Sequence, residues 1–282
     1  MPASETSVPK PKSDLTARVT TALIGAPVAV GLMWIGGWPF VLAVVLLALA
    51  AQYELFGMLE AKGGEPQRVL GLVLGAIVAL HAVWPGWWVA AVVGVIALLV
   101  VELFRKKEQP LENLSGTLFS LAYPVLLLSF LIDLRQVRAP GIDGDGAFWL
   151  TLTTLLLVWA TDTLAYFSGR AFGKHKLMPR VSPKKTWEGS IGGLLGAVGV
   201  GIVLKLLVLP FLSALDIVVI ALICGALGQI GDLAESVFKR AAGVKDSGNL
   251  LPGHGGLLDR VDSLLFAVPL VYLYVATVVL AR

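Results

Sequence analysis

Five carboxylate side chains lie at or near the ends of long apolar runs in this sequence. They are Asp162, the pair Asp232 and Glu235, and the pair Asp259 and Asp262. The members of each pair are three residues apart, so each pair shares one face of a helix. Acidic side chains in or beside membrane-spanning segments are costly and mark functional sites. We therefore expect these five carboxylates to gather at one level of the molecule.

Such a cluster of like charges needs a positive partner. One candidate is a hard divalent cation with oxygen ligands, such as Mg²⁺. The alternative is a set of salt bridges with Lys239, Arg240 or Arg260, which lie close to the acids in the sequence. The residue spacing alone favours neither explanation.

A first polar segment, residues 169–188, carries several lysines and arginines together with Ser182 and Thr186. Lysine and arginine bind phosphate oxygens, and the two hydroxyls can donate further hydrogen bonds. A helix that begins near Gly189 adds N-terminal amides, which favour anions. The alternative is a basic loop that obeys the positive-inside rule and touches anionic lipid. The glycine spacing excludes a Walker nucleotide-binding loop.

A second polar segment, residues 237–257, interleaves Lys245, Asp246 and His254 with several glycines. Glycine allows the backbone to approach a ligand closely. A simple linker would not need this mixture of charged residues and glycines, so the segment is a second candidate for the site.

With its flanks, this second segment resembles the C-terminal signature of the phosphatidate cytidylyltransferase family, also called CDP-diacylglycerol synthase. Similar blocks occur upstream at 161–170, 182–189 and 231–236, whereas the first 130 residues resemble the family only as a series of apolar spans. The signature matches at every fixed position, namely Ser236, Lys239, Arg240, Lys245, Asp246, Gly248, Pro252, His254, Gly255, Gly256, Asp259, Arg260 and Asp262.

The resemblance implies a reaction and its cofactor. Members of the family use Mg²⁺ to transfer a cytidylyl group from CTP to phosphatidate, giving CDP-diacylglycerol and pyrophosphate. Whether a second cation takes part stays open. The phosphate of phosphatidate is already anionic, so its attack needs no dedicated base. The difficulty is to bring two anions together and to stabilise the leaving pyrophosphate, which metals and basic residues can do.

The resemblance also implies roles for individual residues. The implied metal ligands are Asp232, Asp259 and Asp262, with Asp162 a weaker candidate. The implied ligands of the CTP phosphates are Ser182, Lys184, Lys185 and Thr186. The catalytic candidates, whose basic members would bind phosphatidate or pyrophosphate, are Asp232, Lys239, Arg240, Lys245, Asp246, His254 and Arg260.

The composition indicates which elements must position these residues. Of 282 residues, 57% are hydrophobic and 15% are charged, and the mean hydropathy is +0.84. Because soluble domains carry about 25% charged residues, an ordinary soluble enzyme, a disordered protein and a coiled coil are excluded. The single cysteine, Cys224, excludes a disulfide framework and a cysteine zinc site.

We predict an all-α polytopic membrane protein of about nine transmembrane helices, because a spanning helix needs about 20 apolar residues. Residues 1–18 are predicted to form a flexible tail, residues 19–135 about five spans, and residues 147–282 a catalytic region of about four spans with polar loops 169–188 and 237–257. The predicted helices are 19–36, 38–59, 68–84, 86–104, 114–133, 147–168, 189–209, 214–236 and 258–280.

The basic residues predict the orientation. With a cytoplasmic N-terminus, eighteen of the 22 lysines and arginines lie on the cytoplasmic side and three on the other side. This bias agrees with the positive-inside rule. It predicts a multi-pass protein of the inner membrane whose active site faces the cytoplasm, where dissolved CTP meets a lipid substrate. It also explains the net charge of +3 without a nucleic-acid partner.

Two other functions stay open at this level. An ion-coupled transporter needs an acidic site near the bilayer midplane, whereas here the acids lie near one face. A related cytidylyltransferase or kinase acting on another lipid would share much of the site. The motifs Gly71-x-x-x-Gly75 and Gly192-x-x-x-Gly196 predict close helix packing, and the resemblance implies a homodimer.

Overall fold

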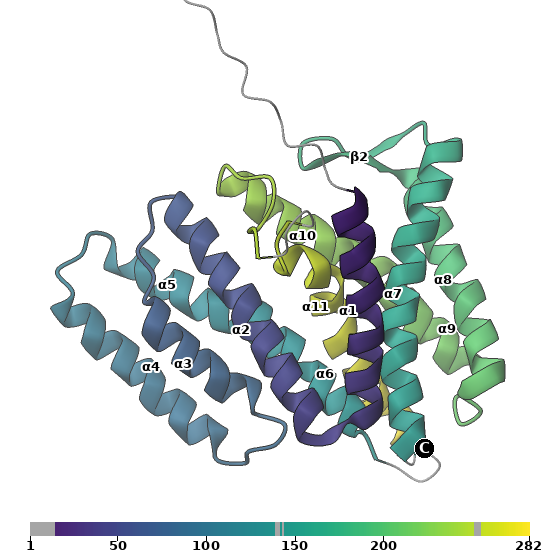
Figure 1. The fold of residues 1–282 in the computed structure, drawn as a ribbon, viewed down its shortest axis with the longest axis horizontal. Coiled ribbons are helices and arrows are strands. Elements are labelled where there is room, and N and C mark those ends of the chain that lie inside the picture. The colour runs from purple at the N-terminus through teal and green to yellow at the C-terminus, as the bar shows by residue number, and fades with distance from the viewer. Residues whose placement is uncertain (1–14, 139–141, 143, 251–254) are drawn as a thin grey trace, which may run out of the picture.

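Long apolar runs become helices in this chain because backbone polar groups in lipid must find partners within the protein. The computed structural model describes residues 15–138, 142, 144–250 and 255–282 (Figure 1). Its helices are α1 (Leu15–Ile35), α2 (Gly37–Ala61), α3 (Arg68–Ala79), α4 (Trp87–Phe104), α5 (Pro110–Ser120), α6 (Leu127–Gln136), α7 (Gly144–Phe172), α8 (Trp187–Val208), α9 (Ala214–Leu222), α10 (Gly228–Ala241) and α11 (Leu258–Tyr274).

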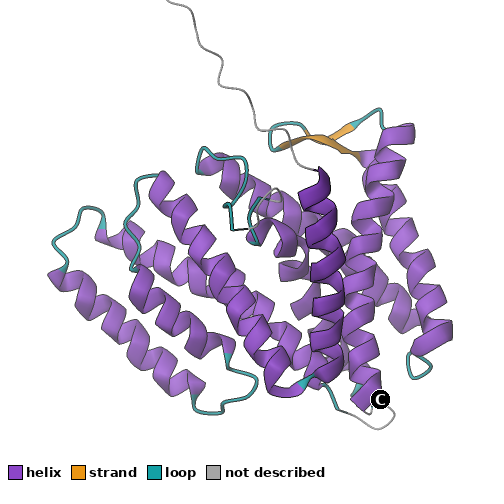
Figure 2. Cartoon of the chain, in the orientation of Figure 1, coloured by secondary structure: helices purple, strands orange, loops and turns teal. Residues whose placement is uncertain are grey.

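Three π-helical turns join or extend these helices, and two short strands form a hairpin. The turns are η1 (Leu121–Leu126), η2 (Ile223–Leu227) and η3 (Val275–Val279), and the strands are β1 (Lys176–Met178) and β2 (Ser182–Thr186). The turns η1 and η2 make α5 with α6, and α9 with α10, into two long helical stretches. The fold is therefore α-helical, with a single antiparallel hairpin in the described part (Figure 2).

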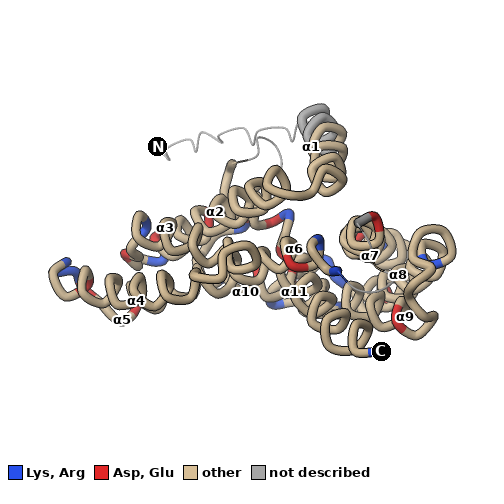
Figure 3. Tube along the Cα trace, turned by 90° about the horizontal axis from the view of Figure 1, so that it is seen from below, with Lys and Arg blue, Asp and Glu red and all other residues tan. Residues whose placement is uncertain are grey.

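The expectation of a polytopic helical membrane protein fits the structure. Among the described residues, seven helices are long and apolar enough to cross a membrane. Two shorter apolar helices, Leu23–Ile35 and Arg68–Ala79, correspond to the other two predicted spans. The count of nine and the cytoplasmic N-terminus therefore stay predictions. In Figure 3 the tubes are mostly uncharged, with charged residues in short separate stretches.

Several predicted boundaries were wrong. The helix expected at 68–84 ends at Ala79, because Leu80 and His81 bond to carbonyls three residues back and tighten the chain before Pro85. The helix expected to end at 168 continues to Phe172, and β1 and β2 form a hairpin within the expected loop 169–188. Residues 15–18 of the expected tail are helical, whereas residues 1–14 lie outside the described part.

Close packing of small residues holds α8 against α7, which carries Asp162, and α3 against α2. A Cβ added at Gly192 or Gly196 of α8 would stand 2.2 Å from Ser168 Oγ or 2.1 Å from Leu164 Cδ1 of α7. On α3, a Cβ at Gly71 or Gly75 would similarly meet side chains of α2. Both small-residue motifs therefore pack helices closely, as predicted.

The α10 helix, which carries Asp232 and Glu235, is held by neighbours from both halves of the chain. It packs on α11, which also contacts α6. Phe238 of α10 makes edge-to-face contacts with Phe119 of α5 and Tyr123 of η1, with ring centroids 5.2 Å apart in each case. These contacts fix the helix between the N-terminal helices and α11.

Candidate active site

A cavity of about 390 Å³ lies between α7, β2, α8 and α10, and we call it the hairpin pocket. Its walls combine carboxylates and cations. Asp162 of α7 and Asp232 of α10 line it together with Lys184 and Lys185 of the hairpin. Lys185 Nζ lies 2.5 Å from Asp232 Oδ2, and both side chains are about one quarter exposed. The pocket can therefore receive an anion on lysines that are already oriented.

The hairpin and the start of α8 shape the same pocket. The strands pair antiparallel, and Trp187 N, directly after β2, donates to the carbonyl of His175 at 2.9 Å. Thr186 ends the strand and caps α8, since its Oγ1 accepts from Gly189 N at 3.2 Å. Gly189 and Ser190 also line the pocket, so the capped first turn of α8 forms the part of its wall beside Lys184 and Lys185.

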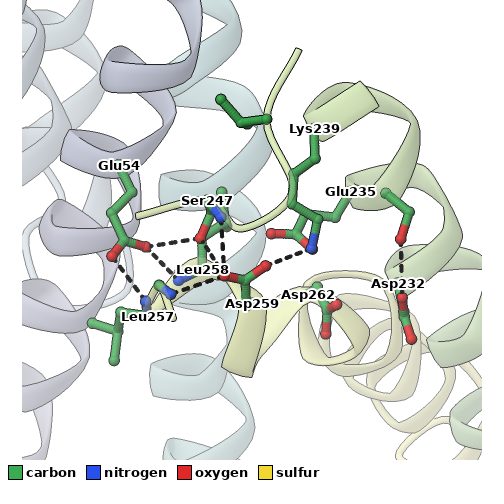
Figure 4. Close-up of polar contacts among 12 residues, drawn as sticks. Glu54, Asp232, Glu235, Lys239, Ser247, Leu257, Leu258, Asp259 and Asp262 are labelled. Atoms are coloured by element: carbon green, nitrogen blue, oxygen red, sulfur yellow. Dashed lines mark hydrogen bonds and ion pairs between the residues drawn. The ribbon is translucent and has the colours of Figure 1, made fainter. Parts of the chain in front are cut away.

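A second group of polar contacts surrounds Lys239, two turns after Asp232 on α10 (Figure 4). The Lys239 side chain is almost fully buried and donates to both Glu235 Oε2 and Asp259 Oδ1. The other oxygen of Asp259 accepts from Ser247 N at 3.0 Å and from Gly256 N at 2.9 Å. Both carboxylate oxygens of Asp259 thus have protein partners.

Glu54 of α2 reaches the same loop from the N-terminal half of the chain. Its side chain is 4% exposed. Its Oε1 accepts from Leu257 N at 2.9 Å, and its Oε2 accepts from Leu258 N at 2.8 Å. The Ser247 hydroxyl lies 3.1 Å from Oε2 as well (Figure 4). Glu54 therefore joins the two ends of the loop that precedes α11.

Asp262 lies between these two groups. Its carboxylate is within electrostatic reach of Asp232, Glu235 and Asp162. Among the described residues, no lysine or arginine forms an ion pair with Asp262 or with Asp162. Nearby, Glu235 Oε1 and the Tyr123 hydroxyl are buried and have no hydrogen-bond partner in the described part. Acidic charge is therefore in excess at this level.

The remaining predicted residues are placed differently. Arg240 is exposed and donates to Val244 O at 3.0 Å, so it closes the end of α10. Lys245, Asp246 and Arg260 are exposed and do not line the hairpin pocket. Ser182, half-buried at the start of β2, does not line it either. The catalytic candidate His254 lies outside the described residues.

Comparison with known proteins gives the family. A model of the cytidylyltransferase family matches residues 16–278. The chain belongs to the cytidylyltransferase family. It is 38% identical over 271 residues to a phosphatidate cytidylyltransferase of Brucella abortus, which covers 93% of each chain. It is 30% identical over 270 residues to the Bacillus subtilis phosphatidate cytidylyltransferase, covering 93% of this chain and 98% of the relative.

A plant relative shows that similar proteins also occur outside bacteria. The chloroplastic phosphatidate cytidylyltransferase 5 of Arabidopsis thaliana is 36% identical over 297 residues, covering 94% of this chain and 73% of the relative. These matches confirm the resemblance seen in residues 161–262 and the expectation of an enzyme of this family. They also extend it to the N-terminal helices, which the sequence motifs alone did not cover.

Sequence reasoning missed Glu54, although a signal was present. Glu54 is an acid within an otherwise apolar helix, and such residues mark functional positions. The prediction considered only the acids near the signature blocks. It also missed Arg170 and Gln229, which line the hairpin pocket. Arg170 lies within one of the blocks that resemble the family.

The donor set fits a hard divalent cation in its chemistry. Asp162, Asp232 and Asp262 supply oxygen donors, and the orphaned buried Glu235 Oε1 adds another. Within the described residues, no group of three or more such side chains is gathered closely enough to hold a metal ion by itself. Proteins usually bind Mg²⁺ through one or two carboxylates together with substrate phosphates. A site of one or two of these aspartates completed by CTP phosphates would fit this pattern.

Proposed function

We propose that this protein transfers the cytidylyl group of CTP to phosphatidate, giving CDP-diacylglycerol and pyrophosphate at a membrane interface. The observation that carries the proposal is the hairpin pocket, in which Lys184 and Lys185 stand beside Asp162 and Asp232. Two anionic substrates need such cations, and a metal-assisted reaction needs such carboxylates. The relatives named phosphatidate cytidylyltransferase support the choice of substrates.

The pocket residues suit the binding of the CTP triphosphate. Lys184 and Lys185 would bind its oxygens. On binding, Lys185 would exchange its contact with Asp232 for a phosphate oxygen, which frees the Asp232 carboxylate. An oxygen of the lipid phosphate then forms a bond to the α-phosphorus of CTP, and the bond to the β-phosphate oxygen breaks. Pyrophosphate leaves with that electron pair.

Asp232 and Asp262 are the proposed metal ligands, with Asp162 as a further candidate. Mg²⁺ held there supplies positive charge that neutralises the phosphates of CTP and the leaving pyrophosphate. Asp259 is less suited to this role, because Lys239, Ser247 and Gly256 already occupy its oxygens. We assign to Asp259 the holding of the loop before α11.

The place of the pocket suits a reaction between a dissolved and a lipid substrate. It lies at the ends of the apolar helices α7 and α8, beside the hairpin. Phosphatidate can then reach it at headgroup level while CTP enters from water. The cytoplasmic side and the homodimer stay predictions that this placement does not decide.

The test is incorporation of labelled CTP into chloroform-soluble lipid by purified protein supplied with phosphatidate and Mg²⁺. We expect CDP-diacylglycerol as product and its loss when EDTA removes the metal. Lys185→Met should raise the KM for CTP about tenfold, which corresponds to about 1.4 kcal/mol of lost binding. Lys176→Met, on an exposed lysine of β1 outside the pocket, is the matched control and should change KM less than about twofold.

Three results would count against the proposal. No lipid product with phosphatidate but turnover with another lipid would favour a related cytidylyltransferase. Ion uptake without any CTP consumption would favour the transporter. Equal changes in the KM for CTP in Lys185→Met and Lys176→Met would mean that the hairpin pocket does not bind CTP.

A further inference from the structure

A buried carboxylate from the N-terminal half ends inside the loop that carries the family signature. Glu54 accepts hydrogen bonds from the backbone of Leu257 and Leu258 and lies next to the Ser247 hydroxyl. These partners stand at both ends of the segment between Ser247 and Leu258, and they are about 190 or more residues away in sequence. A single side chain thus ties the two loop ends to α2.

The loop backbone packs closely against the Glu54 carboxylate at two glycines. A Cβ at Gly248 would stand 2.6 Å from Glu54 Oε1, and a Cβ at Gly256 would stand 2.6 Å from Oε2. At Gly256 the same Cβ would stand 1.9 Å from Ser247 Oγ, so glycine is required at Gly248 by Glu54 and at Gly256 by Ser247 and Glu54 together. The family signature at Gly248 and Gly256 is, in this chain, partly a requirement of Glu54.

The charge of Glu54 is compensated by the loop and by α11. Among the described residues, no lysine or arginine forms an ion pair with it. Its partners are instead the N–H groups of Leu257 and Leu258, at the start of α11. These are amides that no helix carbonyl can satisfy, and the N-terminus of a helix favours negative charge. Glu54 therefore caps α11.

The next residue along α11 is Asp259, and Ser247 couples it to Glu54. The Ser247 hydroxyl is 3.1 Å from Glu54 Oε2 and 2.9 Å from Asp259 Oδ2, so its single proton serves one carboxylate or the other. Asp259 in turn holds Lys239 of α10. A continuous chain of contacts thus runs from α2 through Ser247 and Asp259 to α10, which carries Asp232 at the hairpin pocket.

We propose that Glu54 is a positioning residue of the reaction, which holds the start of α11 and, through Ser247 and Asp259, sets the geometry of α10 and α11 at the active site. This inference rests on the proposed function for its kinetic part. It gives the N-terminal helices a role in turnover beyond anchoring. Glu54 does not line the hairpin pocket, so CTP binding does not depend on it directly.

The experiment compares three variants of the full-length protein in detergent with phosphatidate. Glu54→Gln keeps the shape but loses acceptor capacity for the loop amides. Glu54→Asp keeps the charge on a side chain shorter by one methylene. Gln52→Ala is the control, since Gln52 is equally buried on α2 but bonds to Gly71 and Ser120, away from the loop.

We expect Glu54→Gln to lower kcat by about 10- to 100-fold while the KM for CTP stays within about twofold, because misplacement of reacting groups costs rate more than binding. Glu54→Asp should recover part of kcat. Hydrogen exchange should become faster at the amides of Leu257 and Leu258 in Glu54→Gln and not in Gln52→Ala. Gln52→Ala should lower thermal stability but keep kcat within about twofold.

Several outcomes would overturn the inference. They are wild-type kcat in Glu54→Gln, an equal loss of kcat in Gln52→Ala, or a rise in the KM for CTP that accounts for the whole effect. If Glu54→Gln does not fold, Ser247→Ala removes the hydroxyl between the two carboxylates and must give the same split between kcat and KM. If the wild-type protein has no activity with CTP and phosphatidate, the proposed function fails, whereas the exchange rates still decide whether Glu54 holds the loop.

Discussion

At the scale of single residues, the acids near the signature divide into two kinds that their spacing does not distinguish. Asp259 is bonded on both oxygens and holds the buried Lys239. Asp262 has no lysine or arginine partner in the described part and lies near Asp232 and Glu235. Asp259 is therefore held by the protein on both oxygens, whereas Asp262 accepts a hydrogen bond from the adjacent Ser263 N, and we propose that Asp262 serves a ligand.

This difference predicts opposite effects of two substitutions of the same chemical kind. Asp259→Asn should lower stability by about 3 kcal/mol, because removing one partner leaves the buried Lys239 poorly compensated. Asp262→Asn should leave stability within about 1 kcal/mol or raise it, because it relieves repulsion, while activity is lost. The measurement is thermal unfolding followed by a thiol-reactive dye, since the single cysteine, Cys224, is buried and reacts only on unfolding.

The pair is its own control, since both variants exchange one carboxylate for an amide on the same face of α11. Equal stability losses would mean that Asp262 has a structural partner too. Normal turnover by Asp262→Asn would remove it from the metal ligands.

The residue types in the sequence predicted which residues belong to the site, but not which of them contact one another. The signature located Lys239 and Asp259, and the upstream block at 231–236 located Asp232, but whether an acid faces a lysine or a pocket depends on packing between helices. Lys239 could equally have faced a phosphate, and only the folded chain places it between Glu235 and Asp259. The contacts of Glu54 could not be predicted, because its partners lie in a distant part of the sequence.

At the scale of elements, the contact between α7 and α8 determines the shape of the hairpin pocket. The two helices approach closely through glycines, and each contributes residues to the pocket wall. From Gly192 and Gly196 the sequence predicted close helix packing, but not that α7 is the partner. It did not predict the hairpin, because the five residues of β2, Ser-Pro-Lys-Lys-Thr, carry no alternating apolar pattern that would indicate a strand.

We predict that one added methyl group in this contact disturbs the site. In Gly193→Ala, the new Cβ would stand 2.7 Å from the carbonyl oxygen of Thr161, next to Asp162, and 2.8 Å from Ala165 Cβ. Because backbone cannot rotate away, the helices must separate, at a cost of about 1–3 kcal/mol. Thermal unfolding and the KM for CTP should both change.

Gly199→Ala is the control on the same helix, since a Cβ there meets no atom within 4 Å. It should keep activity and gain a little stability, as alanine favours a helix over glycine by up to about 1 kcal/mol. A stable and fully active Gly193→Ala would show that the contact tolerates separation and does not set the pocket.

At the scale of the whole molecule, the contacts between loops fix which ends of the helices share a side. Lys107, after α4, pairs with Glu65, before α3, at 2.8 Å. Glu54, near the end of α2, contacts the start of α11. The hairpin and the end of α10 lie at the top of Figure 1, and the C-terminus lies at the bottom. The hairpin pocket is therefore at the same end of the molecule as the start of α11 and the end of α10.

The sidedness does not depend on whether every helix crosses the membrane. With 12 residues, α3 is about 18 Å long, shorter than the hydrocarbon core of about 30 Å. The turn after α3 leads into α4, which returns the chain to the side from which α3 began, as the Lys107–Glu65 pair requires. The predicted orientation can therefore hold although nine full spans are not established.

The expected sidedness of the molecule predicts the pattern of labelling by a membrane-impermeant maleimide. In a Cys224→Ala background, Arg138→Cys should react in intact cells, whereas Lys62→Cys should react only after the membrane is opened. Both positions are exposed, and Lys62 lies on the side of the proposed active site while Arg138 lies at the opposite end. Basic residues stay on the cytoplasmic side during insertion, and CTP is available there, so both arguments require this order. The unsubstituted protein, whose Cys224 is buried, gives the background labelling. The reverse order of labelling would mean that the orientation is inverted and that the pocket is on the side of the membrane opposite to cytoplasmic CTP.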